Sequence, residues 1–394
     1  MNVSEATRVA FTAIAANRLR SGLTVLGVVI GVMSVVLLVA VGTGARNVVT
    51  AGVEDLGSNL LLVVPGSFEF GQAPTVSKFT LDDVDRIERE LGGEVAVTGN
   101  LASGETVRAG SVSAFASVIG VTASFDEVLN REVVRGEFIT DSDVATARRV
   151  ASLGAGAARA LFPDSDPIGK DVSVAGLRFR VISVIGEVGA AIGVDRDSQV
   201  LVPITAAQRL FGTQRVDAIF VKGPEREELE ATGDRITALL AERLDDGEFS
   251  VVTQDEILGV AGTILDTLTL VLAAIAGISL LVGGIGVSNI MLVSVQERTR
   301  EIGLRKALGA RTRDITAQFL VEAIVLCGVG GVIGIALGVG LAELAAAVSP
   351  LPADVTGWSV ALAFGVSVGV GVAFGVFPAR RAGKLDPVVA LRYE

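Results

Sequence analysis

Four long stretches of the chain are apolar and contain no ionisable residue. They are bounded by Arg20 and Arg46, by Asp266 and Glu297, by Glu322 and Glu343, and by Asp354 and Arg380. A helix of about 20 apolar residues crosses the hydrocarbon core of a bilayer, and buried helices of soluble proteins seldom run this far without a charge. The first stretch exceeds the apolar region of a signal peptide, and no clear cleavage site follows it. The pattern therefore predicts four transmembrane helices, the first of them an uncleaved anchor.

The segment between the first two predicted spans has a mixed strand and helix pattern. It begins with a strand at 59–64, a helix at 80–91 and a strand at 95–101, and it ends with a strand at 216–222, a helix at 224–244 and a strand at 249–253. Thr80 with Asp83 three residues later is a helix-capping pattern, and Pro224 suits the first position of a helix. Two β-α-β units in this order predict a split βαβ, ferredoxin-like porter lobe. Residues 105–212 carry mostly strand signals and predict an inserted β-rich lobe.

The distribution of charge predicts the orientation of the chain. The N-terminal segment, the link between the second and third spans and the C-terminal tail are rich in arginine and lysine, whereas residues 46–262 are acidic. Because basic loops stay in the cytoplasm, both termini and the 296–314 link are expected inside and the large acidic segment outside. The net charge of −11 argues against nucleic acid as a partner. We expect a multi-pass protein of the cell membrane, with the lipid bilayer around its helices.

The composition excludes several kinds of site. The sequence has no histidine, and Cys327 is its only cysteine, so His-based triads, His metal sites, CxxC sites and an intrachain disulfide are ruled out. No G-x-x-x-x-G-K-[ST] phosphate loop occurs, so these residues are not expected to hydrolyse ATP. A Ser–Lys catalytic pair, Ser77 with Lys78 or Ser173 with Lys170, is a remote alternative to solvated surface. We expect no catalytic residue, no metal and no bound cofactor.

Glycines recur within the predicted spans at intervals that suit close helix packing in lipid. They are Gly27 and Gly31 in the first span, Gly283, Gly284 and Gly286 in the second, Gly330, Gly334 and Gly338 in the third, and Gly365, Gly369, Gly371 and Gly375 in the fourth. Among the acids near the span ends, Asp266 and Asp354 are expected to be solvated at the outer interface. Glu322 is expected to snorkel, and the alternative is that it lines the interior of the helix bundle. Trp358 suits an anchor at the membrane interface.

The link between the second and third spans predicts a short amphipathic helix. Glu301 and Arg305 stand in the favourable order for a helical ion pair, and Gly309 suits the position that ends a helix. Three apolar residues lie on this short exposed link: Ile302, Leu304 and Leu308. One interpretation is a docking helix whose apolar residues enter a partner's cleft while its arginines pair with acidic residues there. The alternative is that the basic residues only set the orientation of the chain.

Several motifs resemble those of a known family. NRLRSGLTVLGVVIGVMSVV (17–36), GGIGVSNIMLVSVQERTREIGLRKALGA (283–310) and FPARRAGKLDPVVALRYE (377–394) are similar to signatures of the MacB/FtsX-type ABC transporter permeases. RGEF, ALFPDSDPIGK and FRVISVIG within 135–186 are similar to the MacB-type extracytoplasmic domain. The resemblance covers nearly the whole chain. It implies a dimer of four-span subunits, either identical or paralogous, in which ATP-driven movement reaches the outer domains by mechanotransmission.

The resemblance also implies which residues contact an ATPase. The family's contact helix corresponds here to Glu297, Arg298, Arg300, Glu301, Ile302, Leu304, Arg305, Lys306, Leu308 and Gly309. MacB carries its nucleotide-binding domain fused before the first span, whereas this sequence starts almost at that span, so we expect a separate ATPase subunit that holds ATP and Mg. The outer domain is expected to meet a substrate or an accessory protein.

The resulting hypothesis is a permease subunit that drives export or extraction of a substrate. An FtsX-like signal transducer that activates an external partner is the alternative, and a membrane-anchored enzyme is a third. The fold class is four transmembrane α-helices with a large α/β (α+β) extracytoplasmic domain inserted between the first two. The expected parts are an N-terminal amphipathic segment (1–20), spans at 21–43, 263–295, 315–345 and 355–378, an outer domain (44–262) with a porter lobe (50–104 and 213–256) and a β-rich lobe (105–212), a coupling helix (296–314) and a cytoplasmic tail (379–394).

Overall fold

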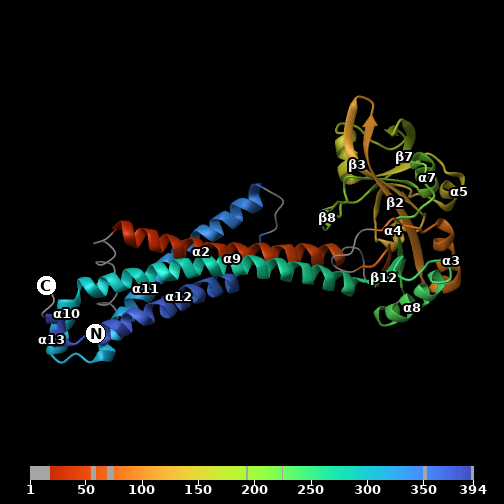
Figure 1. Cartoon of the computed structure of the whole chain (residues 1–394). Coiled ribbons are helices and arrows are strands. Elements are labelled where there is room, and N and C mark those ends of the chain that lie inside the picture. Colours follow the sequence, from red (N-terminus) through yellow and green to blue (C-terminus); the bar gives the residue numbers. More distant parts are fainter. Residues whose placement is uncertain are drawn as a thin grey trace. The chain divides into compact units, whose positions relative to one another are not determined.

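The computed structural model divides the chain into two compact units. One is a helical unit made of Met1–Asn47 and Leu265–Glu394, and the other is an α/β unit, Val48–Ile264 (Figure 1). The structure describes residues 18–54, 59–68, 75–191, 194–223, 225–348 and 353–391. Most of the expected N-terminal amphipathic segment, residues 1–17, lies outside the described residues.

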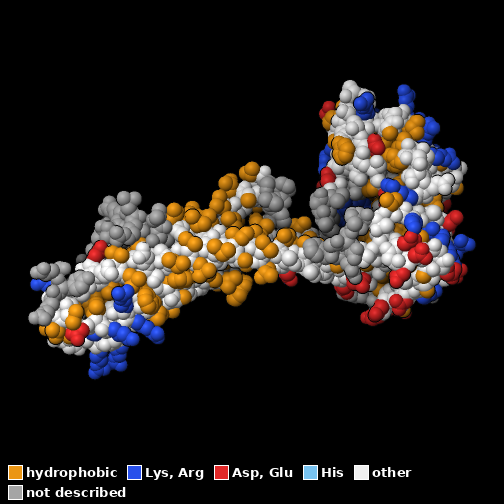
Figure 2. Space-filling view, viewed as in Figure 1, with side chains coloured by type: hydrophobic (Ala, Val, Ile, Leu, Met, Phe, Trp, Pro, Cys, Tyr) orange, Lys and Arg blue, Asp and Glu red, His pale blue; other side chains and the backbone are white. Residues whose placement is uncertain are grey.

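Four helices of the chain are long and apolar enough to cross a membrane. They are α2 (Arg18–Glu54), α9 (Gln254–Glu297), α11 (Thr312–Val348) and α12 (Gly357–Gly383). The four predicted spans are thereby confirmed, although each helix is longer than its predicted span. Two short helices, α10 (Thr299–Ala307) and α13 (Pro387–Leu391), follow α9 and α12. Apolar side chains cover the middle of the helical unit, while Lys and Arg side chains lie at the end that carries α10 (Figure 2).

Glycines mark the places where α2 meets α9 in the helical unit. A Cβ atom added to Gly27 would lie 3.0 Å from the Cα of Gly283, and one added to Gly283 would lie 2.9 Å from the carbonyl carbon of Gly27. One turn along, a Cβ on Gly31 would lie 2.7 Å from the side chain of Leu280. The two backbones therefore touch at Gly27 and Gly283, where neither helix has room for a side chain.

The glycines of α11 and α12 serve further helix crossings. Cβ atoms on Gly330, Gly334 and Gly338 of α11 would meet Val28, Val29 and Val36 of α2 at 3.1, 2.8 and 2.9 Å. On α12, a Cβ on Gly371 would meet Cys327 of α11 at 3.1 Å, and one on Gly375 would meet Ala323 of α11 at 2.5 Å. On α9, a Cβ on Gly284 would overlap the ring of Phe374 of α12. Gly286 is half-buried. Gly365 and Gly369 are exposed, with no atom within 4 Å of an added Cβ, so this repeat packs no helix within the described residues.

Polar residues tie α2 to its neighbours near the end opposite α10. Arg46 pairs with Asp266 at 2.5 Å, and the Asn47 amide donates to the Asp354 carboxylate at 2.7 Å. Both acids are exposed, as predicted, and both also have a partner on α2. Trp358, at the start of α12, is 71% exposed.

The first half of the α/β unit has the split βαβ topology. Its elements are β1 (Leu60–Pro65), α3 (Leu81–Leu91), β2 (Ala96–Ala109), β11 (Ala218–Lys222), α8 (Leu229–Leu240) and β12 (Phe249–Thr253). The strand order is β12-β1-β11-β2, and every neighbouring pair is antiparallel. This order confirms the ferredoxin-like lobe. The capping pattern is also confirmed, because the Thr80 N–H donates to the Asp83 carboxylate at 2.7 Å.

Helix α8 is shorter than predicted at both ends. A 3-10 turn, Arg226–Glu228, precedes it, in which the Glu228 N–H binds the Glu225 carbonyl three residues back. Pro224 lies outside the described residues. At the other end the chain leaves the helix after Leu240, and the Arg243 guanidinium pairs with Asp83 of α3.

The second half of the α/β unit is a closed barrel that shares β2 with the first half. Its other strands are β3 (Val112–Val121), β10 (Gln199–Pro203), β5 (Val150–Gly154), β7 (Leu177–Ile185) and β6 (Asp171–Val174), with β4 (Val133–Gly136) added beside β7. β6 pairs with both β7 and β2, which closes the ring β2-β3-β10-β5-β7-β6. Closure leaves no free edge between these strands. The β-rich lobe thus continues the sheet of the porter lobe.

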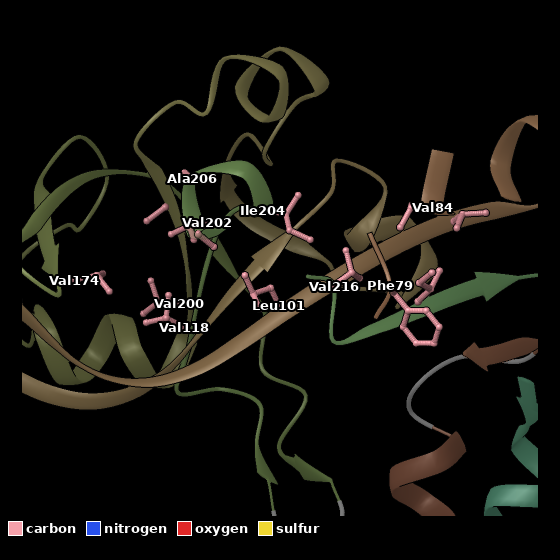
Figure 3. Packing of buried hydrophobic residues seen from close by; sticks show 14 of the residues in the cluster. Phe79, Val84, Leu101, Val118, Val174, Val200, Val202, Ile204, Ala206 and Val216 are labelled. Atoms are coloured by element: carbon pink, nitrogen blue, oxygen red, sulfur yellow. The ribbon is translucent and has the colours of Figure 1, made fainter. Parts of the chain in front are cut away.

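Short helices cover the sheet, and one core runs through both halves. The helices are α4 (Phe125–Val128), α5 (Asp141–Thr146), α6 (Ala155–Leu161) and α7 (Ile204–Phe211), and a small hairpin consists of β8 (Ala190–Ala191) and β9 (Val194–Asp195). Phe79 and Val84 of the first half belong to the same buried cluster as Val118 and Val202 of the barrel (Figure 3). The two halves therefore form one folded domain with a common core.

Candidate functional site: a two-faced helix at the end of the membrane bundle

The helix on the link between the second and third spans is α10, which is shorter than the expected 296–314 because α9 runs to Glu297 and α11 starts at Thr312. It begins one residue after Arg298 and ends at Ala307. Gly309 has φ +97°, a conformation that L side chains rarely adopt, so glycine is required where the chain leaves the helix. Glu297 is the last residue of α9, so it lies before α10. The predicted ion pair is present, with Arg305 Nη2 2.5 Å from Glu301 Oε1.

One face of α10 packs inside the helical unit. Ile302 is 1% exposed and belongs to the core of that unit. Gly303 lies against α13, because a Cβ added to it would be 2.7 Å from the Cβ of Ala390. The expectation that Ile302 is exposed for docking is therefore wrong. α13 lies about 85 residues later in the chain and covers this face.

Two basic side chains of α10 hold it to the neighbouring spans. Arg305 Nη1 donates to Gln318 Oε1 of α11 at 2.9 Å. Lys306 Nζ donates to the carbonyl oxygens of Gly383 and Leu385 at 2.6 and 2.8 Å. Carbonyls at the C-terminal end of a helix have no partner within the helix, so this lysine satisfies the end of α12. Arg305 and Lys306 therefore act within the subunit.

Just before α10, Arg298 reaches an acid of the third span. Its Nη1 lies 3.4 Å from Glu322 Oε2, and Glu322 is 7% exposed. The expectation that Glu322 snorkels to the surface is wrong and the alternative of an interior position is correct, because the carboxylate finds its counter-ion inside the bundle. A buried charge without such a partner would be strongly destabilising.

The opposite face of α10 is open. Leu304 and Leu308 are 53% and 82% exposed, and Arg300 and Glu301 beside them are also exposed. The described residues of this chain therefore leave Leu304 and Leu308 uncovered. Of the ten predicted contact residues, the structure leaves six at the surface: Glu297, Arg300, Glu301, Leu304, Leu308 and Gly309.

Sequence reasoning missed the residues that hold α10 in place. Gln318 and Ala390 gave no local signal, since their roles depend on contacts with α10 across the fold. Gly303 did give one, because a glycine in the middle of a helix costs about 1 kcal/mol relative to alanine and usually has a packing reason.

Three residues of the two predicted Ser–Lys pairs have other contacts in the outer domain. Ser77 Oγ donates to the Val216 carbonyl, and Lys78 pairs with Glu248. Lys170 lies over the Phe162 ring, 5.4 Å from its centre. Within the described residues no group of three or more His, Cys, Asp or Glu side chains is arranged to hold a metal ion.

Comparisons with known families define the class of protein. Residues 21–239 match the MacB-like periplasmic core domain, and residues 273–387 match the FtsX-like permease C-terminal domain. The chain belongs to the MacB-like permeases of the ABC transporter family, and it is a multi-pass membrane protein with a large extracytoplasmic domain.

Curated relatives agree with this assignment over nearly the whole chain. The macrolide export ATP-binding/permease protein MacB of Bdellovibrio bacteriovorus is 40% identical over 395 residues, which cover 98% of this chain and 61% of that protein. MacB of Azoarcus sp. is 40% identical over 392 residues, covering 99% and 60%. The chain thus spans about 60% of the length of these relatives. The crystal structure of the periplasmic region of MacB from Actinobacillus actinomycetemcomitans is 22% identical and covers 52% of this chain and 93% of its own, with a TM-score of 0.46.

Proposed function

We propose that this chain is the membrane subunit of an ABC exporter and that the open face of α10 docks an ATPase. The 394 residues contain no phosphate loop, so ATP and Mg are assigned to a partner, which we propose is a separate subunit. A second permease chain, identical or paralogous, would complete the transporter.

The two-faced arrangement of α10 is the observation that supports this proposal most directly. Leu304, Leu308 and Arg300 are exposed for a partner, while Ile302 is buried and Lys306 binds the end of α12. A partner that moves α10 would therefore also move the ends of α11 and α12. A loosely attached loop would absorb such a displacement.

The lengths of α9 and α2 support transmission toward the outer domain. α9 is one helix of 44 residues, which extends for about 66 Å at 1.5 Å per residue. About 20 residues suffice to cross the hydrocarbon core, so both α9 and the 37-residue α2 exceed a single crossing. α9 starts directly after β12 and ends two residues before α10. We propose that α9 and α2 pass movement between α10 and the outer domain, where it drives export.

A crosslinking experiment tests the docking step. Cys327 is buried, so a cysteine that replaces Leu308 is expected to be the reactive thiol. Co-expressed with an ABC ATPase from the same source, Leu308→Cys should crosslink to that ATPase. Phe115→Cys, at a 76% exposed position of the outer domain, should not.

Two matched double substitutions by glutamate provide the functional test. Arg300→Glu with Leu308→Glu should abolish co-purification of the ATPase, while Arg313→Glu with Phe115→Glu should leave it intact. Both double variants change one exposed arginine and one exposed apolar residue. Equal co-purification from the two variants would overturn the docking assignment. Because the relatives are named as macrolide exporters, macrolide stimulation of the ATPase in the reconstituted complex is the first test of substrate class.

A further inference from the structure

The end of the fourth span carries a groove that the proposed coupling does not use. Phe377, Arg380 and Arg381 follow one another at intervals of three residues and one, which places them along one face of α12, and Lys384 comes directly after the end of that helix. The groove, with a volume of about 550 Å³, is lined by these four residues together with Leu385, Asp386 and Val389. It therefore combines a helix face, the turn after α12 and the start of α13.

The groove is apolar at some positions and basic at others. Phe377 and Val389 are each 63% exposed. Arg380, Arg381 and Lys384 are also exposed, and none of the three forms an ion pair with another described residue. The contrast with Arg298 and Arg305 at the same end of the unit is clear, since each of those pairs with an acid.

The acid that lines the groove, Asp386, already accepts a hydrogen bond from the backbone. Asp386 Oδ1 accepts the Val388 N–H at 2.8 Å at the start of α13. Lys306, which binds the Gly383 and Leu385 carbonyls, brings a further positive charge to the same turn. The groove thus carries an excess of positive charge.

We propose that this groove binds the headgroup and upper acyl region of an anionic phospholipid. Guanidinium groups pair with phosphate in a bidentate manner, and basic pockets at the end of membrane helices suit anionic headgroups. Phe377, one turn further into the span, provides an apolar contact for the chain of the same molecule. The proposal depends on the chain spanning a membrane, and it is independent of the ATPase-docking assignment.

Retention of lipid by the full-length protein tests the proposal. The chain is reconstituted in nanodiscs of phosphatidylcholine with one-fifth phosphatidylglycerol, and lipids that remain bound after mild detergent extraction are counted by native mass spectrometry. Each basic residue near an anionic surface contributes a factor of about five to affinity. Changing Arg380, Arg381 and Lys384 together to alanine should therefore weaken phosphatidylglycerol binding by roughly 100-fold.

Control variants separate a specific groove from general charge. The variant with Arg300, Arg311 and Arg313 changed to alanine removes the same number of exposed charges from the same end of the unit and should retain the lipid. Replacing Arg380, Arg381 and Lys384 by other basic residues (Lys, Lys and Arg) should restore most of the binding and show that the fold tolerates substitution there. Phe377→Ala should reduce phosphatidylglycerol retention but leave binding of soluble glycerol phosphate unchanged.

The same data contain the results that would overturn the proposal. One is equal loss of phosphatidylglycerol from the two triple-alanine variants. A second is displacement of the lipid by free inorganic phosphate at millimolar concentration, which would show that the site holds only a phosphate group. A third is a result in which the variant with Arg380, Arg381 and Lys384 changed to alanine retains the lipid but has a changed oligomeric state or no longer co-purifies with the ATPase. This result would show that a protein covers the groove.

Discussion

The contact between α2 and α9 predicts a specific loss of stability when Gly283 becomes alanine. The added methyl group would lie 2.9 Å from the carbonyl carbon of Gly27 and 3.0 Å from the nitrogen of Val28. Ordinary contacts of a Cβ atom begin at 3.4 Å, so the methyl group is about 0.5 Å too close to backbone atoms, which cannot rotate away. Relief requires the two helices to separate.

The magnitude follows from two opposing effects. Replacing glycine by alanine within a helix gains about 1 kcal/mol, whereas overpacking costs about 1–3 kcal/mol. Gly277 lies on the same helix, and no atom of the described residues is within 4 Å of an added Cβ there, so Gly277→Ala has only the gain. The free energy of unfolding should therefore be lower for Gly283→Ala than for Gly277→Ala by about 1–3 kcal/mol.

The assay follows the unfolding of the helical unit by a single probe. Trp358 is the only tryptophan and lies in α12, so its fluorescence during SDS titration in mixed micelles reports on that unit. Equal unfolding free energies of the Gly283→Ala and Gly277→Ala variants, within about 0.5 kcal/mol, would refute the close helix crossing.

Two further predictions concern buried acids. Arg298→Gln should destabilise the helical unit by up to about 3 kcal/mol because Glu322 loses its counter-ion, and Arg298→Gln with Glu322→Gln should recover most of the loss in the same SDS titration. In the outer domain, burial by itself raises the pKa of Asp143, but hydrogen bonds from the Thr140 N–H and hydroxyl and from the Arg148 guanidinium outweigh burial and lower it below its ordinary value. The ionised form of Asp143 thus stabilises the fold above the unfolded pKa of about 4, and this stability is lost as the pH falls toward the lower folded value. Thermal midpoints measured between pH 6 and pH 2.5 should fall less steeply for Asp143→Asn than for the parent, and identical slopes would contradict this origin.

Local signals in the sequence were sufficient for many of the elements. Thr80 and Asp83 specify the start of α3 through contacts three residues apart, and Gly309 specifies the end of α10 through its own backbone conformation. The spans follow from the absence of charge over a length that water-soluble helices seldom reach. Each of these signals lies within the element that it predicts.

The remaining features depend on contacts between distant parts of the chain. Barrel closure rests on the pairing of Val107 with Val174, which no local pattern reveals. The burial of Ile302 requires α13, and the burial of Glu322 requires Arg298 between α9 and α10. A sequence pattern identifies an apolar or charged residue, but its surroundings decide whether that residue packs inside the subunit or meets a partner. This limit explains why only part of the predicted contact surface is exposed.

The opposite placement of α10 and the outer domain across the membrane is the central claim, and cysteine labelling tests it most directly. Leu308 is 82% exposed, Phe115 is 76% exposed, and the native Cys327 is buried, so single introduced cysteines give separate signals. A membrane-impermeant maleimide applied to intact cells should label Phe115→Cys, and it should label Leu308→Cys only after permeabilisation. Labelling of both variants in intact cells, or of neither before permeabilisation, would contradict the account.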